Sequence, residues 1–91
     1  MNRFELLNLE VIASNSSENI SVIHNKNTHT YEVTCYVLAS EERAYRYGEY
    51  CYRSKVFKYK KSALKLFEKL VSYFEDYGKQ YIINNQERWF K

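Results

Sequence analysis

Tyrosines and basic residues are interleaved over residues 36–58, where they could bind an anionic or a flat aromatic partner. In chain order this set is Tyr36, Arg46, Tyr50, Tyr52, Arg53, Lys55 and Lys58. Aromatic rings beside cations on a sheet are suited to stacking bases while neutralising phosphates. Tyr and Arg are equally enriched at protein–protein hot spots. A third interpretation is purely structural, because Tyr favours strands.

A second basic set lies in the first half of a predicted helix and contains Lys60, Lys61, Lys65 and Lys69, of which the first two are at its start. The first helical turn presents backbone amides that already favour anions. Charge is also distributed unevenly along the chain. Residues 1–42 carry two basic and six acidic side chains, whereas residues 43–91 carry twelve basic and five acidic ones. This asymmetry indicates an anionic partner, and the alternative is a solvated face that keeps the protein dispersed in water.

Metal binding and catalysis have weaker support. The expected pairing of strands places His24 opposite His29, and Cys35 follows further along the strand, but no C-x-x-C or H-x-x-x-H spacing accompanies them. No residue lies in a recognisable nucleophile motif. We therefore expect no catalytic residue, no metal and no cofactor, and we interpret Cys35 and Cys51 as buried thiols in a reducing compartment.

These side chains are positioned by one predicted helix, residues 60–77, closed by Gly78. Apolar residues recur at helical spacing along it, with Ser62 as the expected N-cap. The apolar stripe consists of Ala63, Leu66, Phe67, Leu70, Phe74 and Tyr77.

Upstream of that helix, apolar residues alternate as strands do. Residues 4–13 suit either a strand or a short helix, whereas residues 20–24, 31–37 and 43–57 are predicted strands separated by polar turns. Closing the hairpins across these turns pairs Val11 with Val22, Ala13 with Ile20, Val22 with Tyr31, Tyr45 with Val37, and Tyr47 with Cys35. One face then collects Leu9, Val11, Ile20, Val22, Tyr31, Val33, Cys35, Val37, Tyr45, Tyr47 and Cys51. Because all three predicted turns place apolar residues on this one face, a strand is favoured for the N-terminal segment. Tyr36, Arg46, Tyr50 and Tyr52 fall on the opposite face.

The predicted fold is therefore α+β: an antiparallel meander of three or four strands with one face covered by the helix at 60–77. We expect one domain over residues 1–91. Residues 79–91 suit either a short hairpin about Asn84 and Asn85 or a further helical turn. No apolar run is long enough to span a membrane and no secretion signal is visible, so the expected location is the cytoplasm.

The segments HTYEVTCYV (29–37) and KKSALKLFEKL (60–70) resemble the double-stranded-RNA-binding domain. That family has a strand that follows a histidine and a KKxA-type helix start whose lysines contact phosphates. The resemblance implies that His29, Lys60, Lys61 and Lys65 would contact nucleic acid. The approach to the lysines lacks the family's glycines, and Phe67 stands near a position where small alanines are usual.

As a whole, this short Lys-, Asn- and Tyr-rich chain with a bare sheet and one helix looks like the small accessory proteins of phages, of which anti-CRISPR inhibitors are the best-known class. The likeness implies a non-catalytic inhibitor that docks on a nucleic-acid-handling protein or a ribonucleoprotein of a bacterial defence system, in the host cytoplasm. The alternative function is direct, sequence-tolerant binding of nucleic acid through the basic aromatic sheet face and the helix lysines.

Overall fold

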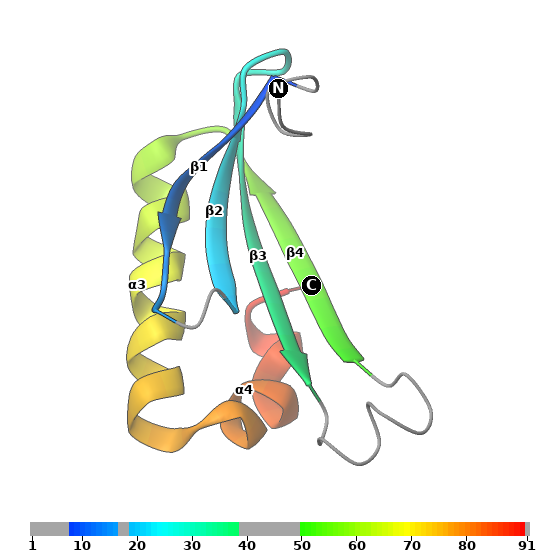
Figure 1. The fold of residues 1–91 in the computed structure, drawn as a ribbon, viewed down its shortest axis with the longest axis vertical. Helices are drawn as coiled ribbons and strands as arrows, with labels where there is room; N and C mark the ends of the chain where they lie inside the picture. The colour runs from blue at the N-terminus through cyan, green and yellow to red at the C-terminus, as the bar shows by residue number, and fades with distance from the viewer. Residues whose placement is uncertain (1–7, 17–18, 39–49, 91) are drawn as a thin grey trace.

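The computed structural model describes residues 8–16, 19–38 and 50–90. Four strands form one antiparallel sheet in the order β1-β2-β3-β4 (Figure 1). Their bounds are Leu9–Ser14 for β1, Ile20–Asn25 for β2, Thr30–Leu38 for β3 and Tyr50–Phe57 for β4. The chain continues into helix α3 (Lys60–Tyr77), helix α4 (Lys79–Asn85) and a short 3-10 turn, η1 (Gln86–Arg88). The predicted α+β meander is confirmed, including the choice of strand near the N-terminus.

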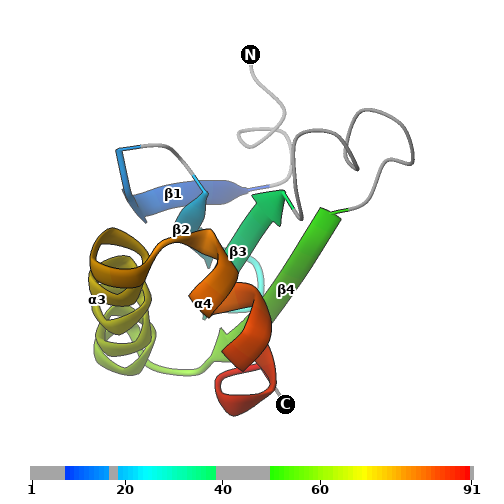
Figure 2. The same ribbon diagram turned by 90° about the horizontal axis from the view of Figure 1, so that it is seen from below.

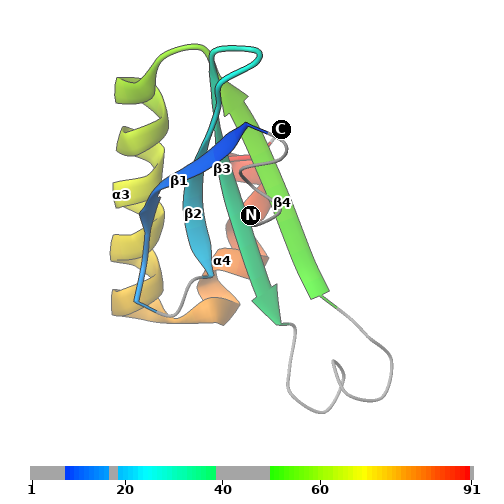
Figure 3. The same cartoon turned by 45° about the horizontal axis from the view of Figure 1, so that its top comes forward.

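All the helices lie on one face of the sheet, and the other face is uncovered in the described part of the chain (Figures 2 and 3). Helix α3 packs along β2 and β3, and α4 continues beneath β3. The buried cluster between the layers consists of Ile20, Val22, Val33, Cys35, Ala63, Leu70, Ile82, Trp89 and Phe90. The C-terminal segment, which the sequence left undecided, is therefore helical and completes the core. No helix among the described residues is long and apolar enough to cross a membrane.

Helix α3 has the predicted bounds, but its ends and its stripe differ in detail. Tyr59 is the N-cap, not Ser62, and its side chain makes no capping hydrogen bond. Gly78 ends the helix at φ 82°, a region that favours glycine, and donates its N–H to the carbonyl of Phe74. Tyr77 is 62% exposed, so the predicted stripe ends one turn earlier than expected.

The predicted pairing partners in the first two hairpins are wrong. Val22 pairs with Val33, not Tyr31, because the four-residue turn lies at residues 26–29, one residue later than the expected turn at residues 25–28. The Asn25 side chain stabilises this turn by accepting hydrogen bonds from the N–H groups of Asn27 and Thr28. The shift is even, so Ile20 and Val22 still share the core face with Val33 and Cys35.

A register shift between Val11 and Ala13 changes which side chains of β1 face the helices. Val11 pairs with Ile23 and Ala13 with Val22, so Ala13 is on the helix side while Val11 and Leu9 are on the uncovered side. Their predicted place in the core was therefore wrong. The extra residue of a bulge reverses the alternation of sides along a strand, which explains why simple period-2 counting failed here.

The β3–β4 register also differs from the prediction. Arg53 pairs with Cys35, and Cys51 pairs with Val37. The predicted partners, Tyr45 and Tyr47, lie outside the described residues, as does Arg46. The predicted strand began at residue 43, whereas the described strand begins at Tyr50.

Candidate functional site

A groove lies between the edge strand β4 and helix α3, and the C-terminal turn lines part of it. It has a volume of about 310 Å³, and we call it the cationic groove. Its lining residues are Lys55, Phe57, Ser62, Lys65, Leu66, Lys69, Arg88 and Trp89. Four of these residues are basic and none is acidic.

The sheet register explains why β4 contributes a lysine and a phenylalanine to this groove. Lys55 pairs with the core residue Val33, and Phe57 pairs with Tyr31. Residues that are directly opposite on an antiparallel pair share a face, so Lys55 and Phe57 are on the helix side of the sheet. The Lys55 ammonium lies 5.6 Å from the centre of the Phe57 ring, within cation–π range.

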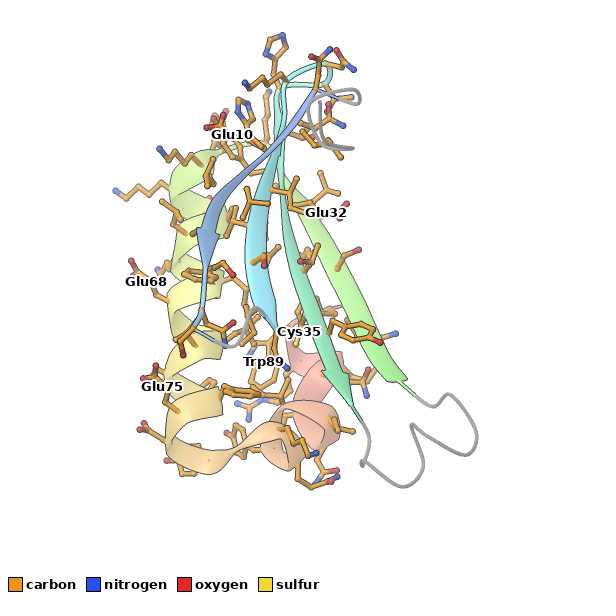
Figure 4. The ribbon with its side chains drawn as sticks, viewed as in Figure 1. Glu10, Glu32, Cys35, Glu68, Glu75 and Trp89 are labelled. Carbon is orange, nitrogen blue, oxygen red and sulfur yellow. The ribbon has the colours of Figure 1, made fainter. Side chains whose placement is uncertain are left out.

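An ion pair joins the C-terminal turn to β4. The guanidinium of Arg53 donates to the carboxylate of Glu87, which directly precedes Arg88 and Trp89. Trp89 is buried and packs against Tyr73 of α3, with ring centres 5.5 Å apart. In Figure 4 Cys35 and Trp89 lie between the sheet and the helices. These contacts hold Arg88 beside the lysines of α3.

In the part of the chain that the structure describes, the groove cations form no ion pair. Within residues 8–16, 19–38 and 50–90, the ion pairs are Glu10 with Lys26 and Arg53 with Glu87. Lys55, Lys65, Lys69 and Arg88 take part in neither pair, and all four are exposed to solvent. The groove therefore concentrates positive charge above an apolar base made by Phe57, Leu66 and Trp89.

The predicted helix lysines lie beside the groove rather than all within it. Lys65 lines it, whereas Lys60 and Lys61 line a hollow on the outer flank of α3 together with Lys65 and Glu68. Lys58 lies over the ring of Tyr59, 5.7 Å from its centre, in the link between β4 and α3. Lys69, the fourth member of the predicted set of helix lysines, also lines the groove at i, i+4 spacing from Lys65, whereas Arg88 was not predicted.

The predicted aromatic and basic set is divided between the two sides of the sheet. The backbone register pairs Tyr36 with Tyr52 and Leu38 with Tyr50, and Tyr36 is 43% exposed. Arg53 and Lys55 alternate with Tyr52 and lie on the helix side. The structure thus brings Lys55 and Lys65 together, and it separates both from Tyr36.

The uncovered side of the sheet, which we call the open sheet face, is mostly apolar and hydroxylic. Leu9, Val11, Ile23 and Val56 lie on it around Glu32, and Val11 and Val56 are 44% and 57% exposed. Tyr36 lies on the same face, four residues further along β3. A hollow on this face is lined by Leu9, Ile23, Asn25, Thr28, Thr30, Glu32 and Val56. Figure 4 shows Glu32 on this side. The alternation of Ile23 and Val56 with core-facing neighbours was a signal for this face that the sequence analysis did not use.

The predicted His24–His29 juxtaposition is wrong. His24 pairs with Tyr31 and stacks on its ring at 4.6 Å, while His29 lies in the turn at φ 57°. The displacement of the turn by one residue places His29 within it rather than on the strand. No group of three metal-binding side chains occurs among the residues that the structure describes.

We expect the two cysteines of the chain to titrate as thiols in denatured protein that has been purified without reductant. Cys35 is buried and pairs with Arg53, whereas Cys51 pairs with Val37, so the two cysteines are diagonal neighbours. Diagonal positions are about 7–8 Å apart, beyond the usual Cα separation of about 4.4–6.8 Å in a disulfide. A chromogenic thiol titration that detects fewer than two thiols per chain would contradict this pairing.

Comparison with known proteins identifies no relative: no family model, no curated protein and no solved structure matches the chain.

Proposed function

We propose that this chain is a non-catalytic binding protein that docks through its open sheet face on a ribonucleoprotein of a bacterial defence system, in the manner of phage-encoded anti-CRISPR inhibitors. The observation that carries the proposal is the apolar character of the open sheet face. On an uncovered face of an antiparallel sheet, the outward side chains are ordinarily polar. Here Leu9, Val11, Ile23 and Val56 form an apolar cluster among outward positions that otherwise carry mainly hydroxyl and amide side chains, and Tyr36 is exposed further along β3.

The charge on this face also supports a protein partner. Among its described residues, Glu32 is the one charged side chain, since Arg53 and Lys55 lie on the helix side. Depletion of charge and enrichment of aromatic residues are typical of the centre of a protein–protein interface. Tyr36, which is exposed on this face, is of a residue type enriched at hot spots.

The sign of the net charge favours a partner that is already loaded with nucleic acid. The chain carries a net charge of +3. An empty nucleic-acid-binding channel is itself basic and would repel such a chain, whereas bound guide or target strands reverse the sign of the surface. We therefore propose docking on the loaded complex.

The alternative function, direct nucleic-acid binding by Tyr36, Tyr52 and the helix lysines together, requires a strand that passes around the sheet edge. Tyr36 is on the open sheet face, and α3 covers the opposite face. A basic site on the helix side alone would not require a strand to pass around the sheet edge.

The test is a binding measurement on purified CRISPR effector complexes, with and without guide RNA. We expect the parent chain to bind a loaded complex and to block its interference activity. Val11→Thr, Tyr36→Thr and Val56→Thr combined should weaken this binding at least about thirtyfold, because an interface hot spot contributes about 2 kcal/mol or more. Threonine keeps strand propensity, so circular dichroism and melting temperature should stay near those of the parent.

A matched control carries three exposed substitutions on the helices that also leave the net charge unchanged, Ser72→Ala, Gln80→Ala and Asn84→Ala, and should bind as the parent does. If the sheet variant and the helix variant lose affinity equally, the open sheet face is not the docking surface. Absence of binding to every loaded complex, or tighter binding to complexes without guide RNA, would overturn the proposed function.

A further inference from the structure

We infer that the cationic groove binds the phosphate backbone of single-stranded nucleic acid. This site is on the helix side of the sheet, and its binding does not depend on docking of the open sheet face. The groove is built from three separate segments: β4, the middle of α3, and the residues that follow α4.

The arrangement of charge indicates an anionic ligand. Lys65 and Lys69 are one helical turn apart, a rise of about 6 Å. Like charges at this spacing destabilise a helix slightly, and Lys55 and Arg88 add further positive charge to the same groove. None of the four is paired with an acid in the described part of the chain. An anion that lies between them would offset this repulsion.

The size of the groove favours one strand over a duplex. A volume of about 310 Å³ is at the lower end for a site that encloses a small ligand. It accommodates a group of nucleotide size between the walls formed by β4 and α3. A duplex, whose major groove alone is about 12 Å wide, would be too wide to enter and would contact only the outermost ammonium groups.

The base of the groove favours nucleic acid over an acidic polypeptide. Phe57, Leu66 and Trp89 lie among the cations, and Phe57 is half-buried with Lys55 above its ring. Single-strand-binding proteins combine a basic path for phosphates with aromatic and apolar surface for bases and sugars. A run of acidic side chains would use the cations but would have nothing to place against the apolar base.

Contacts on either side of Arg88 fix the groove in this shape. Arg53 pairs with Glu87, and Trp89 packs against both Tyr73 and Tyr81. Since Trp89 is also the only tryptophan of the chain, its fluorescence reports directly on a ligand in the groove. This signal distinguishes binding in the groove from binding elsewhere on the surface.

The experiment titrates the full chain into fluorescently labelled oligothymidylate and oligouridylate while anisotropy is recorded over a series of salt concentrations. Four phosphate contacts predict a slope of log K against log salt of about −3, from about −0.7 per contact on a single strand. Unlabelled oligonucleotide should change the Trp89 fluorescence over the same concentration range. A duplex of equal length and polyglutamate should compete at least about tenfold less well.

Two charge-reversed double variants are compared. The groove variant carries Lys65→Glu and Lys69→Glu, and the control variant carries Lys26→Glu and Lys79→Glu. All four lysines are exposed, and both variants change the net charge equally, but only the first pair lines the groove. The groove variant should lose at least about tenfold in affinity, and its salt slope should become shallower by about 1.4. Lys65→Arg with Lys69→Arg should retain binding.

Equal losses in the two charge-reversed variants would show that net charge alone drives the binding and would overturn the assignment. So would the absence of binding at low salt, or binding without any change in Trp89 fluorescence. If polyglutamate competes as well as the oligonucleotide, the groove is a site for acidic polypeptides and not for nucleic acid. A duplex that binds as tightly as the single strand would refute the choice of strand.

Discussion

Replacing Trp89 by alanine is expected to lower the free energy of unfolding by about 3–5 kcal/mol, a large part of the stability of a small domain. Trp89 is only 7% exposed and lies in a buried cluster with Ile82 and Phe90. Its ring contacts Tyr73 and Tyr81, and aromatic pairs of this kind contribute beyond their buried area. The substitution leaves a cavity between α3, α4 and the sheet.

Urea unfolding followed by circular dichroism measures this effect without relying on the tryptophan that is removed. Trp89→Phe keeps a ring in the cavity and should recover more than half of the loss. The neighbouring exposed residue provides the matched control, because Arg88→Ala should change stability by less than about 0.5 kcal/mol. An alanine variant at Trp89 as stable as this control would mean that the C-terminal turn does not belong to the core.

Replacing Leu70 by alanine is expected to destabilise the protein by about 2–5 kcal/mol. Leu70 is fully buried in the middle of α3 and belongs to the same core cluster as Val22 and Val33. Its removal therefore affects the contact between the main helix and the two central strands. The melting temperature should fall by several degrees per kcal/mol in a domain of this size.

Two further substitutions on α3 show whether the loss comes from packing. Ser72→Ala, on the exposed side of the helix, should leave the melting temperature unchanged or slightly raised. Tyr77→Ala should be much milder than Leu70→Ala, because Tyr77 is largely exposed and keeps only ring contacts with Tyr73 and Tyr81. If Tyr77→Ala lowered the melting temperature more than Leu70→Ala, Tyr77 would belong to the buried stripe, as the sequence predicted.

The sequence by itself determined the main helix and the general layout of the sheet. The bounds at Lys60 and Tyr77 follow from helical periodicity and from Gly78, and both are local properties of the chain. Alternation over residues 31–37 likewise identified the core face of β3, because side chains of a strand alternate regardless of their partner.

Register, the bulge and the C-terminal segment were decided by tertiary structure. Periodicity cannot distinguish two registers that differ by an even number of residues, so Arg53 rather than Tyr47 could oppose Cys35 without any change of face. The bulge near Ala13 and the helical choice for residues 79–85 depend on what they pack against. Short segments of this kind are stabilised mainly by tertiary contacts.

The cationic groove shows the same limit for a functional site. Lys55, Lys65, Lys69 and Arg88 come from three segments, and only the i, i+4 spacing of Lys65 and Lys69 indicates a contact within the set. Two long-range features bring them together: the β3–β4 register that turns Lys55 toward α3, and the Arg53–Glu87 pair that holds the C-terminal turn against β4. The sequence determined that the second half of the chain is basic, and only the packing of β4, α3 and the C-terminal turn decided where that charge is concentrated.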